Sequence, residues 1–496
     1  MRNRASATAQ TVANVAASVQ LDPALASNPV AGRLMILLGS PDGGEPRFEL
    51  GQAESSTPIL GMDVAKLEPG GTVRTLRAPS QFPLESLTRI RAGEYQAQAV
   101  LHTNLDLNLP NAPGDLYSQP TRVRIDPARP EPMALVLNQQ LPADRLPAET
   151  EWVKSIKLRS QVLSQFHGRD MFLRAAVIVP RGFTEQTDQR YPLRVHVGGY
   201  GSRYLSALGR MERGGGFAQL WQSDAAPKFL IVHLDGAGPL GDPYQIDSAN
   251  HGPYGTALTT ELIPHIERQF RGNGRRVLDG GSTGGWVSFA LQVFYPEYFQ
   301  GCWSSCPDPL DFRSFQRINI YDDASAYVDG AAREVPSCRD PRSGQVRFTV
   351  RQECAMENVL GLGDSWAMSG QQWGAWNATF GPQGPDGRPV PLWNPVTGQI
   401  DQSILEHWMK FDMRRHLEAN WAKLAPLLKG KLRVWIGEAD DYYLNEPVHR
   451  FDAAVRHLVP KFDGQITFGP GYGHCWSSLN EPALMKEMAA AVALKE

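Results

Sequence analysis

The amino-acid sequence predicts two folded domains, an all-β sandwich followed by a doubly wound α/β domain with a mostly parallel sheet. The length of 496 residues exceeds what one hydrophobic core ordinarily serves. Short apolar runs separated by Gly and Pro fill residues 31–141, whereas strands alternate with helices from residue 153 onward. The content of 42% hydrophobic and 20% charged residues is typical of globular proteins.

Residues 1–30 are expected to form a leader outside the folded domains. Two arginines precede a stretch rich in Ala and Val, and residues 24–27 (A-L-A-S) resemble a signal-peptidase site. Polar residues such as Thr8 and Asn14 interrupt the apolar core that a signal peptide needs. A disordered leader and a working signal both stay open, and with them a cytoplasmic or a secreted or periplasmic location.

Residues 31–141 are expected to form the β-sandwich, because their short strands are bounded by turn-forming residues. We expect this domain to brace the catalytic domain or to mediate a homodimer, and polymer binding is the alternative. A Pro-containing stretch at 142–152 is the predicted linker. The candidate strands are 33–38, 94–101 and 133–137.

Residues 153–496 show the alternation that is typical of a parallel sheet covered by helices on both faces. A helix is predicted over 258–270, where apolar residues recur three and four positions apart, and another from residue 481 to the end. The predicted strands are 193–197, 229–234, 432–436 and 465–468.

Residues 312–429 interrupt this alternation and are predicted to be an inserted cap. The segment is rich in Gly and Pro, and a structureless loop of that length is improbable in a compact domain. A helix is expected over 403–427. The tryptophans of the segment form either the core of the cap or an aromatic wall on a substrate pocket.

The sequence G-G-S-T-G at residues 280–284 lies between a predicted strand and a predicted helix. It matches G-x-S-x-G, the nucleophile elbow, in which glycines remove the Cβ atoms that would clash in a sharp turn. The free N–H groups of the following helix favour a developing negative charge. Ser282 is therefore the predicted nucleophile.

A serine hydroxyl needs a base, and the base needs an acid that holds its tautomer. His474 follows the last predicted strand, and the segment G-E-A-D-D-Y-Y at 437–443 follows the strand before it. When the three residues follow one another as serine, acid and histidine, the acid is expected after the strand before the last and the histidine after the last strand. We predict His474 as the base and Asp440 as the acid, with Asp441 and then Glu438 as alternatives.

Two backbone N–H groups are expected to stabilise the oxyanion of the tetrahedral intermediate. One belongs to Thr283, the residue after the nucleophile. The other is expected from V-G-G-Y-G at 197–201, where we nominate Tyr200, with Gly199 as the alternative. A phosphate loop is set aside because no Lys-Ser or Lys-Thr pair follows these glycines.

Charge and cysteine spacing exclude several functions. The net charge of −3 indicates no nucleic-acid partner, and no apolar run approaches the ~20 residues that span a bilayer. The five cysteines fit no common zinc pattern, so neither a metal nor another cofactor is expected. Either Cys338 and Cys354 form a disulfide, or all five cysteines are free thiols.

Three segments, 233–267, 279–312 and 437–445, together resemble the putative-esterase group of α/β-hydrolases, which includes esterase D, feruloyl esterases and enterochelin-type esterases. The resemblance covers roughly residues 191–312 and 431–496. It implies the α/β-hydrolase fold and a triad at the three positions named above. The cap departs from the compact members of the group. The residues expected to border the substrate pocket are Gly199, Asn250, Tyr254 and Trp286.

The leading hypothesis is therefore a serine carboxylic-ester hydrolase that acts on a small-molecule ester, with aromatic or glycoside esters preferred because the cap is rich in tryptophan. A peptidase or an acyltransferase on the same triad is the alternative. A non-catalytic binding protein on a hydrolase scaffold is the third hypothesis. The presence of a serine, an acid and a histidine in the order of a triad argues against this third hypothesis.

Overall fold

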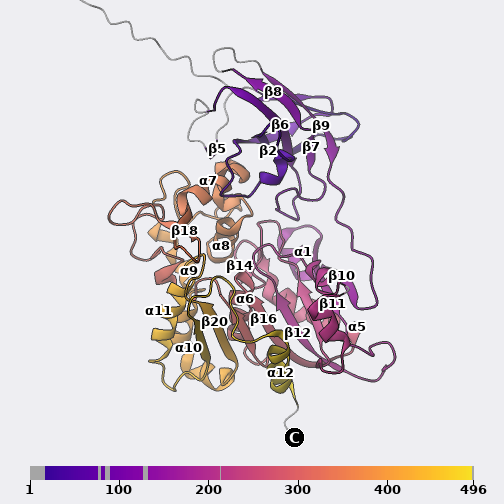
Figure 1. The fold of residues 1–496 in the computed structure, drawn as a ribbon, viewed down its shortest axis with the longest axis vertical. Coiled ribbons are helices and arrows are strands. Elements are labelled where there is room, and N and C mark those ends of the chain that lie inside the picture. Colours follow the sequence, from indigo (N-terminus) through magenta and orange to yellow (C-terminus); the bar gives the residue numbers. More distant parts are fainter. Residues whose placement is uncertain (1–16, 76–79, 84–89, 127–131, 213, 494–496) are drawn as a thin grey trace, which may run out of the picture. The chain divides into compact units, whose positions relative to one another are not determined.

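The computed structural model describes residues 17–493, apart from 76–79, 84–89, 127–131 and 213. The chain divides into two compact units (Figure 1). The first comprises residues up to Leu105, Pro110–Asp144 and Cys354–Ser369. The second comprises Asp106–Leu109, Arg145–Glu353 and the chain from Gly370 onward. A short piece of the segment expected as a cap therefore belongs to the first unit.

The first unit contains one mostly antiparallel sheet, in the order β4-β1-β9-β7-β6-β2-β3-β5, with β8 paired to β6. Within the described part of this sheet, β1 and β9 are the one parallel pair. Strands β3 and β4, far apart in this order, contact each other, so the sheet curves back on itself. The strands are β1 (Ala17–Leu21), β2 (Val30–Gly39), β3 (Ile59–Leu67), β4 (Thr72–Thr75), β5 (Ser80–Phe82), β6 (Gly93–His102), β7 (Leu116–Ser118), β8 (Thr121–Ile125) and β9 (Met133–Gln140).

Strand β2 packs both of its faces, because side chains alternate between the two sides of a strand. Leu34 and Ile36 belong to the inner core, whereas Met35 and Leu37 face a second cluster. The second cluster includes Met356, Val359 and Leu360 from the end of α7 (Val350–Leu360). The continuous apolar run of β2 is thus explained by burial on two sides.

The first strand begins inside the segment expected as a leader. Residues 17–21 form β1, and Val19 and Leu21 are buried in the core of the sheet. The expectation of an unfolded leader up to residue 30 is therefore wrong from residue 17 onward. The part of the expected leader before residue 17 lies outside the described residues.

The second unit contains an eight-stranded sheet in the order β10-β11-β13-β12-β16-β17-β20-β21. Strand β11 is antiparallel to both of its neighbours, and the other pairs are parallel. This is the predicted α/β-hydrolase fold (Figure 1). The strands are β10 (Val153–Ser160), β11 (Met171–Ile178), β12 (Tyr191–Val197), β13 (Leu230–Leu234), β16 (Gly272–Gly281), β17 (Cys302–Ser305), β20 (Leu432–Gly437) and β21 (Gln465–Gly469).

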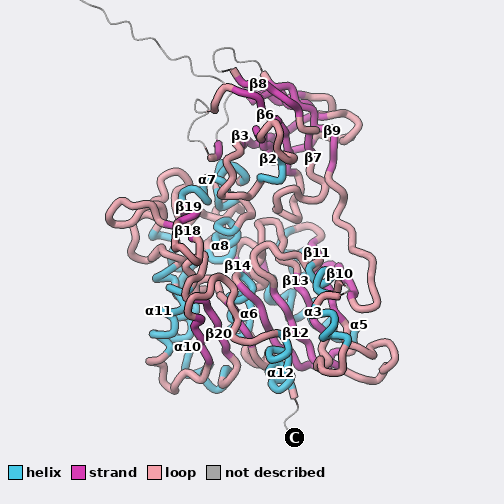
Figure 2. The backbone as a smooth tube through the Cα atoms, viewed as in Figure 1, coloured by secondary structure: helices cyan, strands magenta, loops and turns pink. Residues whose placement is uncertain are grey.

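Helices cover both faces of this sheet (Figure 2). On one face, α2 (Ser206–Arg210), α3 (Gly216–Gln222) and α12 (Glu481–Val492) pack on the strands in a single apolar cluster. On the other face, α6 (Thr283–Phe294) packs against α10 (Met413–Leu428) through Phe294 and His416. It packs against α11 (Asn445–Val455) through Phe289 and Phe451.

The helix predicted over 258–270 is interrupted at its start. The structure places α4 at Tyr254–Ala257, a π-helical turn at Leu258–Leu262 and α5 at Ile263–Phe270. Pro264 lies at the beginning of α5. Because proline has no N–H to donate, it breaks the regular hydrogen-bond ladder of the preceding turn.

The tryptophans of the inserted segment are packed inside the protein. Trp373 lies 4.7 Å from Trp376 and 5.1 Å from Trp393 between ring centroids. All six tryptophans of the segment are at most 5% exposed. They therefore form internal cores rather than an exposed aromatic wall. The remaining elements are α1 (Gln161–His167), β14 (Asp247–Ser248), β15 (Gly252–Pro253), β18 (Pro336–Arg339), β19 (Val346–Thr349), α8 (Gln372–Phe380) and α9 (Leu405–Met409).

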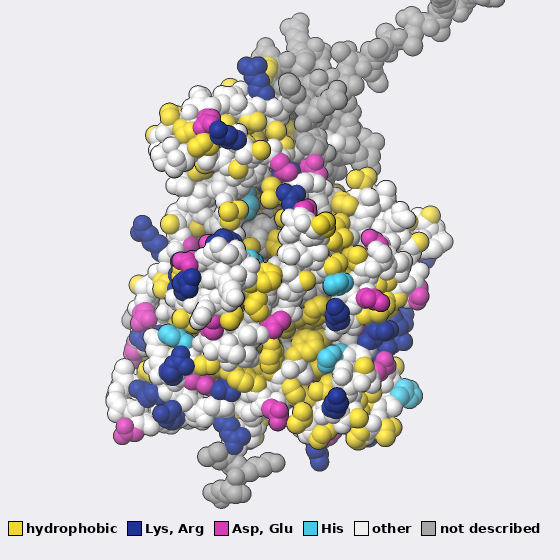
Figure 3. Space-filling view, turned by 180° about the vertical axis from the view of Figure 1, so that it is seen from behind, with side chains coloured by type: hydrophobic (Ala, Val, Ile, Leu, Met, Phe, Trp, Pro, Cys, Tyr) yellow, Lys and Arg dark blue, Asp and Glu magenta, His cyan; other side chains and the backbone are white. Residues whose placement is uncertain are grey.

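Acidic and basic side chains are intermixed on the face of the molecule shown in Figure 3. This agrees with the small net charge of −3. Among the described residues, none of the helices combines the length and the apolar character needed to cross a bilayer.

Candidate active site

Ser282 occupies the turn between β16 and α6 in a conformation that non-glycine residues rarely adopt. Its backbone angles are φ 58° and ψ −126°. Such a conformation costs free energy and persists only where the surroundings hold it. The N–H of Ser282 donates to Ser305 O at 3.0 Å and to Cys306 Sγ at 3.1 Å. Both acceptors come from the end of β17.

Gly280 and Gly284, one on each side of Ser282, allow the turn to pass close to other backbone segments. A Cβ at Gly280 would lie 2.3 Å from Gly284 O, and one at Gly284 would lie 2.0 Å from Val197 O. Real Cβ atoms do not approach that closely, so neither position accepts a side chain without backbone movement. The turn thus places a serine with positive φ between a strand and a helix, with a closely packed glycine on each side.

His474 and Asp440 form a hydrogen-bonded pair at the same edge of the sheet. His474 Nδ1 lies 2.7 Å from Asp440 Oδ2, and Asp440 is fully buried. The other carboxylate oxygen of Asp440 accepts the N–H groups of Tyr442 at 2.9 Å and Leu444 at 3.1 Å. A carboxylate fixed in this way holds the proton of the imidazole on Nδ1 and leaves Nε2 as the basic atom.

The other two candidate acids have different partners. Asp441 Oδ1 accepts the backbone N–H of His474 at 2.8 Å. Glu438 Oε2 pairs with His449 Nε2 at 2.8 Å, on the exposed side of β20. The geometry of the acid therefore favours Asp440, while Asp441 holds the backbone of the histidine.

The surroundings of His474 raise its pKa above the usual value. Burial alone would lower the pKa, because it disfavours the imidazolium. The hydrogen bond and charge of Asp440 outweigh burial, with smaller contributions from Asp308 and Asp441. The imidazolium that forms when a base takes a proton is thus stabilised in this position.

The hydrogen bond between the serine and the histidine is not formed. Among the described residues, Ser282 Oγ makes no hydrogen bond, and His474 Nε2 lies 3.9 Å from Cys306 Sγ. Both residues therefore border the same sulfur atom. Catalytic hydrogen bonds are often long before substrate binds and tighten in the complex.

The loop nominated for the oxyanion hole approaches Ser282 at Gly199. A Cβ at Gly199 would lie 3.7 Å from Ser282 Cβ, so the loop after β12 passes close to Ser282. Tyr200 Oη donates to Gly370 O. The buried carboxylate of Asp242 accepts the N–H of Gly201 at 3.3 Å, and burial raises the pKa of Asp242 to about 7.

A buried polar cluster behind the elbow was not expected from the sequence. Asp308 Oδ2 accepts from Tyr244 Oη at 2.6 Å, from Trp376 Nε1 at 2.9 Å and from Thr283 Oγ1 at 3.1 Å. Burial raises the pKa of Asp308. This cluster fixes Thr283, whose N–H is the nominated oxyanion donor. The sequence signal for it is weak, since Asp308 stands in a Pro-rich turn after a four-residue strand.

The other nominated pocket residues are buried. Asn250 Nδ2 donates to Ala378 O at 3.1 Å and to Gly381 O at 3.0 Å, which ties it to the end of α8. Trp286 is fully buried against Tyr244 and Phe380. Tyr254 is 5% exposed. The structure thus brings Gly199 close to Ser282 and buries the other three among other parts of the unit.

Other histidines of the unit have different surroundings. His196 Nδ1 lies 3.0 Å from Asp279 Oδ2, which also accepts from the buried Arg194 at 2.7 Å. His196 packs on His233 at 4.7 Å between ring centroids. Arg194 also pairs with Glu481 at the start of α12. This ionic cluster joins the sheet to α12.

A disulfide joins Cys306 to Cys475, with 4.8 Å between their Cα atoms. Both expectations are wrong: Cys338 and Cys354 are buried thiols, and the five cysteines are not all free because Cys306 and Cys475 are bonded. The reason is tertiary: Cys306 follows β17 and Cys475 follows His474, and the parallel sheet brings these two ends together.

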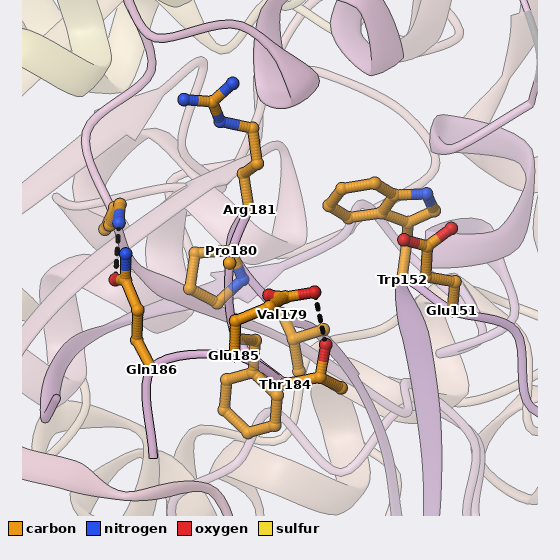
Figure 4. A pocket seen from close by; sticks show the side chains of 11 residues that line it. Glu151, Trp152, Val179, Pro180, Arg181, Thr184, Glu185 and Gln186 are labelled. Carbon is orange, nitrogen blue, oxygen red and sulfur yellow. Dashed lines mark hydrogen bonds between the residues drawn. The ribbon is translucent and has the colours of Figure 1, made fainter. Parts of the chain in front are cut away.

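A surface pocket of 350 Å³ lies elsewhere in this unit (Figure 4). It is lined by Trp152 before β10, by residues 179–186 after β11 and by Lys228 before β13. Because β11 runs antiparallel to β13, these segments meet at the N-terminal ends of the parallel strands. Ser282 lies at the opposite, C-terminal ends of those strands. This pocket is therefore separate from the candidate active site.

Comparisons with solved structures find several proteins to which this chain is similar. A ferulic acid esterase is 16% identical, covers 68% of this chain and 97% of its own, and has a TM-score of 0.38. An S-formylglutathione hydrolase from Agrobacterium tumefaciens is 14% identical, with 70% and 99% covered and a TM-score of 0.35. The fluorophosphonate-binding serine hydrolase F of Staphylococcus aureus is 13% identical, with 69% and 98% covered and a TM-score of 0.38.

These structures are serine hydrolases and esterases, and the chain is similar to them over about 70% of its length, with the N-terminal sheet in addition. No family model matches the sequence. No curated protein matches it either.

Proposed function

We propose that this protein is a serine hydrolase of carboxylic esters, with Ser282, His474 and Asp440 as its catalytic triad. The observation that supports the proposal is the hydrogen bond of 2.7 Å between His474 Nδ1 and Asp440 Oδ2, beside a serine held at φ 58° at the start of a helix. A buried carboxylate on a histidine next to a strained serine is the arrangement that activates a hydroxyl.

The proposed reaction has two steps. Ser282 Oγ attacks the ester carbonyl carbon while His474 Nε2 takes the hydroxyl proton. The bond between that carbon and the alcohol oxygen then breaks, and Nε2 returns the proton to the departing alcohol. Water then gives a proton to Nε2 and attacks the acyl carbon. The bond between that carbon and Ser282 Oγ breaks, Nε2 returns the proton to Oγ, and the carboxylic acid leaves.

The N–H groups of Thr283 and Tyr200 are the proposed donors to the oxyanion. Thr283 is the first residue of α6, where N–H groups have no partner within the helix. Each such donor is worth roughly a hundred- to a thousandfold in kcat. No preference for aromatic esters is proposed, because the tryptophans that suggested it are buried.

The first test compares wild type with Ser282→Ala on p-nitrophenyl esters from acetate to octanoate. We expect kcat/KM to fall by a factor of about 10⁴ or more, because triad members act as a unit. A fluorophosphonate probe should label wild type and leave the variant unlabelled. Ser223→Ala, at an exposed helix end, is the matched control and should keep full activity.

Equal activity of wild type and Ser282→Ala would show that Ser282 is only a turn residue. An amide substrate and a competing alcohol acceptor, assayed beside the esters, identify a peptidase or an acyltransferase if turnover appears there instead. A wild-type protein that the probe does not label would overturn catalysis by Ser282.

A further inference from the structure

The disulfide between Cys306 and Cys475 lies within the candidate active site. Cys475 directly follows His474, and Cys306 directly follows β17, the strand next to the elbow. Both cysteines adopt left-handed backbone angles, with φ 40° at Cys306 and φ 56° at Cys475. Such angles are uncommon in non-glycine residues and persist where tertiary contacts hold them.

The sulfur atoms contact both halves of the proposed triad. Cys306 Sγ accepts the N–H of Ser282 at 3.1 Å and lies 3.9 Å from His474 Nε2. A Cβ on Gly281 would lie 3.2 Å from Cys475 Sγ, so the disulfide packs directly on the elbow. The bond therefore joins the segment that holds the nucleophile to the segment that carries the base.

Apart from the disulfide, noncovalent contacts hold the loop that carries His474, among them the hydrogen bond of 2.9 Å from Ala439 N–H to Tyr472 O. It runs without regular structure from the end of β21 to the start of α12, and Gly471, Tyr472 and Cys475 are exposed. Asp441 holds the N–H of His474 at 2.8 Å, and Ser305 Oγ donates to Trp476 O at 2.8 Å. Loops with few buried contacts open at low free energy. The disulfide is the covalent anchor of this loop.

We propose that the Cys306–Cys475 disulfide is a positioning element of the active site, which keeps His474 paired with Asp440 and directed at Ser282. Its sulfur atoms act through His474 and take no part in bond making. Ester hydrolysis then requires the oxidised form of the protein. This inference rests on the proposed function for its consequence in catalysis, but the geometry of His474 can be tested without a substrate.

Reduction by a dithiol reagent is the way to remove this element. One thiolate of the reagent attacks the exposed Cys475 Sγ, the S–S bond breaks, and Cys306 Sγ leaves as a thiolate that takes up a proton. The second thiol of the reagent then displaces Cys475, which gives two protein thiols and one cyclic disulfide of the reagent. Two thiol sulfurs do not stay at the bonded distance of about 2.05 Å, so the loop that carries His474 is released.

The experiment compares oxidised and reduced wild type under native conditions. We expect reduction to lower kcat about a hundredfold with KM little changed, since a displacement of about 1 Å in a reacting group costs that much. Labelling by the fluorophosphonate probe should slow by the same factor. A chelator is present throughout, because the donor atoms of Cys306, His474 and Cys475 lie within 4.8 Å of one another, and two free thiols with an imidazole would bind metal.

Two further measurements separate positioning from simple stabilisation. The low-field proton resonance of an imidazole Nδ1–H bonded to a carboxylate should be present in oxidised protein and absent after reduction. Cys475→Ala should match reduced wild type in kcat, and the double variant Cys306→Ala/Cys475→Ala should not respond to reductant.

The outcomes distinguish the two proposals. If oxidised wild type is active, but reduction lowers only Tm and leaves kcat and the resonance unchanged, the positioning role is wrong and the proposed function stands. If oxidised wild type neither hydrolyses esters nor reacts with the probe, the proposed function fails. The resonance alone then decides whether the disulfide positions His474.

Discussion

Adjacent carboxylates after β20 hold the imidazole and the backbone of the same histidine. Asp440 accepts from the imidazole of His474, whereas Asp441 accepts from its main-chain N–H at 2.8 Å. The two interactions differ chemically, because only the first changes with the charge of the ring. Substitution of each by the isosteric amide therefore separates orientation of the base from anchoring of its loop.

At the residue scale, we predict that Asp440→Asn lowers kcat/KM by about 10³- to 10⁴-fold, because the amide favours the wrong tautomer of His474. Asp441→Asn should cost much less, since an amide oxygen still accepts the N–H. His474 must be neutral to act as a base, and its pKa is raised. The acid limb of kcat/KM in wild type should therefore lie above the usual histidine pKa of about 6.5.

The pH profiles of the two variants provide the check. Loss of the Asp440 charge should move the acid limb to lower pH, whereas Asp441→Asn should move it only slightly. Equal losses of kcat/KM in the two variants would contradict the assignment of Asp440 as the acid.

At the scale of elements, the elbow depends on how closely α6 approaches the end of β12. A Cβ on Gly284 would lie 2.0 Å from Val197 O and 2.5 Å from Gly198 O. We predict that Gly284→Ala lowers the free energy of unfolding by about 3 kcal/mol, the upper range for overpacking, and abolishes ester hydrolysis. Urea unfolding followed by circular dichroism measures the first effect.

Gly216 at the start of α3 is the matched control for this substitution. A Cβ there meets nothing within 4 Å, and the residue is helical. Gly216→Ala should leave activity unchanged and stability equal or slightly higher, since alanine favours helix over glycine. If Gly284→Ala is as stable and active as Gly216→Ala, the close approach of the backbone is not required.

At the scale of the whole molecule, a segment in the middle of the second unit's sequence belongs to the first unit. Residues 354–369 lie within the sequence of the second unit but belong to the first. Arg33, which is 1% exposed, donates to Val359 O at 2.8 Å and to Asp364 Oδ1 at 2.7 Å. Met356, Val359 and Leu360 complete the outer cluster of the N-terminal sheet.

We predict that a truncated chain starting at Arg145 self-associates, because it exposes these three apolar side chains. Size-exclusion chromatography with light scattering measures the association. The same truncation with Met356→Gln, Val359→Thr and Leu360→Gln is the control and should be monomeric. A monomeric truncation without these changes would contradict the role assigned to residues 354–369.

Sequence patterns predicted the parts of the fold that depend on neighbouring residues. Strand β13 is an almost continuous apolar run, β12 alternates apolar and polar residues, and the elbow is a short motif between a strand and a helix. By contrast, β10 reads V-K-S-I-K-L-R-S, an edge strand with many polar residues, and β17 has only four residues. Neither carries enough apolar periodicity to be singled out.

The sequence by itself determined the α/β class, the G-S-T-G turn and the order in which Ser282, Asp440 and His474 stand along the chain, because each is a local pattern or a matter of chain order. Only the tertiary structure decided between Asp440 and Asp441, since one turn of backbone sets which carboxylate meets the imidazole. It also decided the pairing of cysteines that stand 169 residues apart and the burial of the tryptophans. Contacts between distant segments form only when the sheet brings them together, and no local pattern records them.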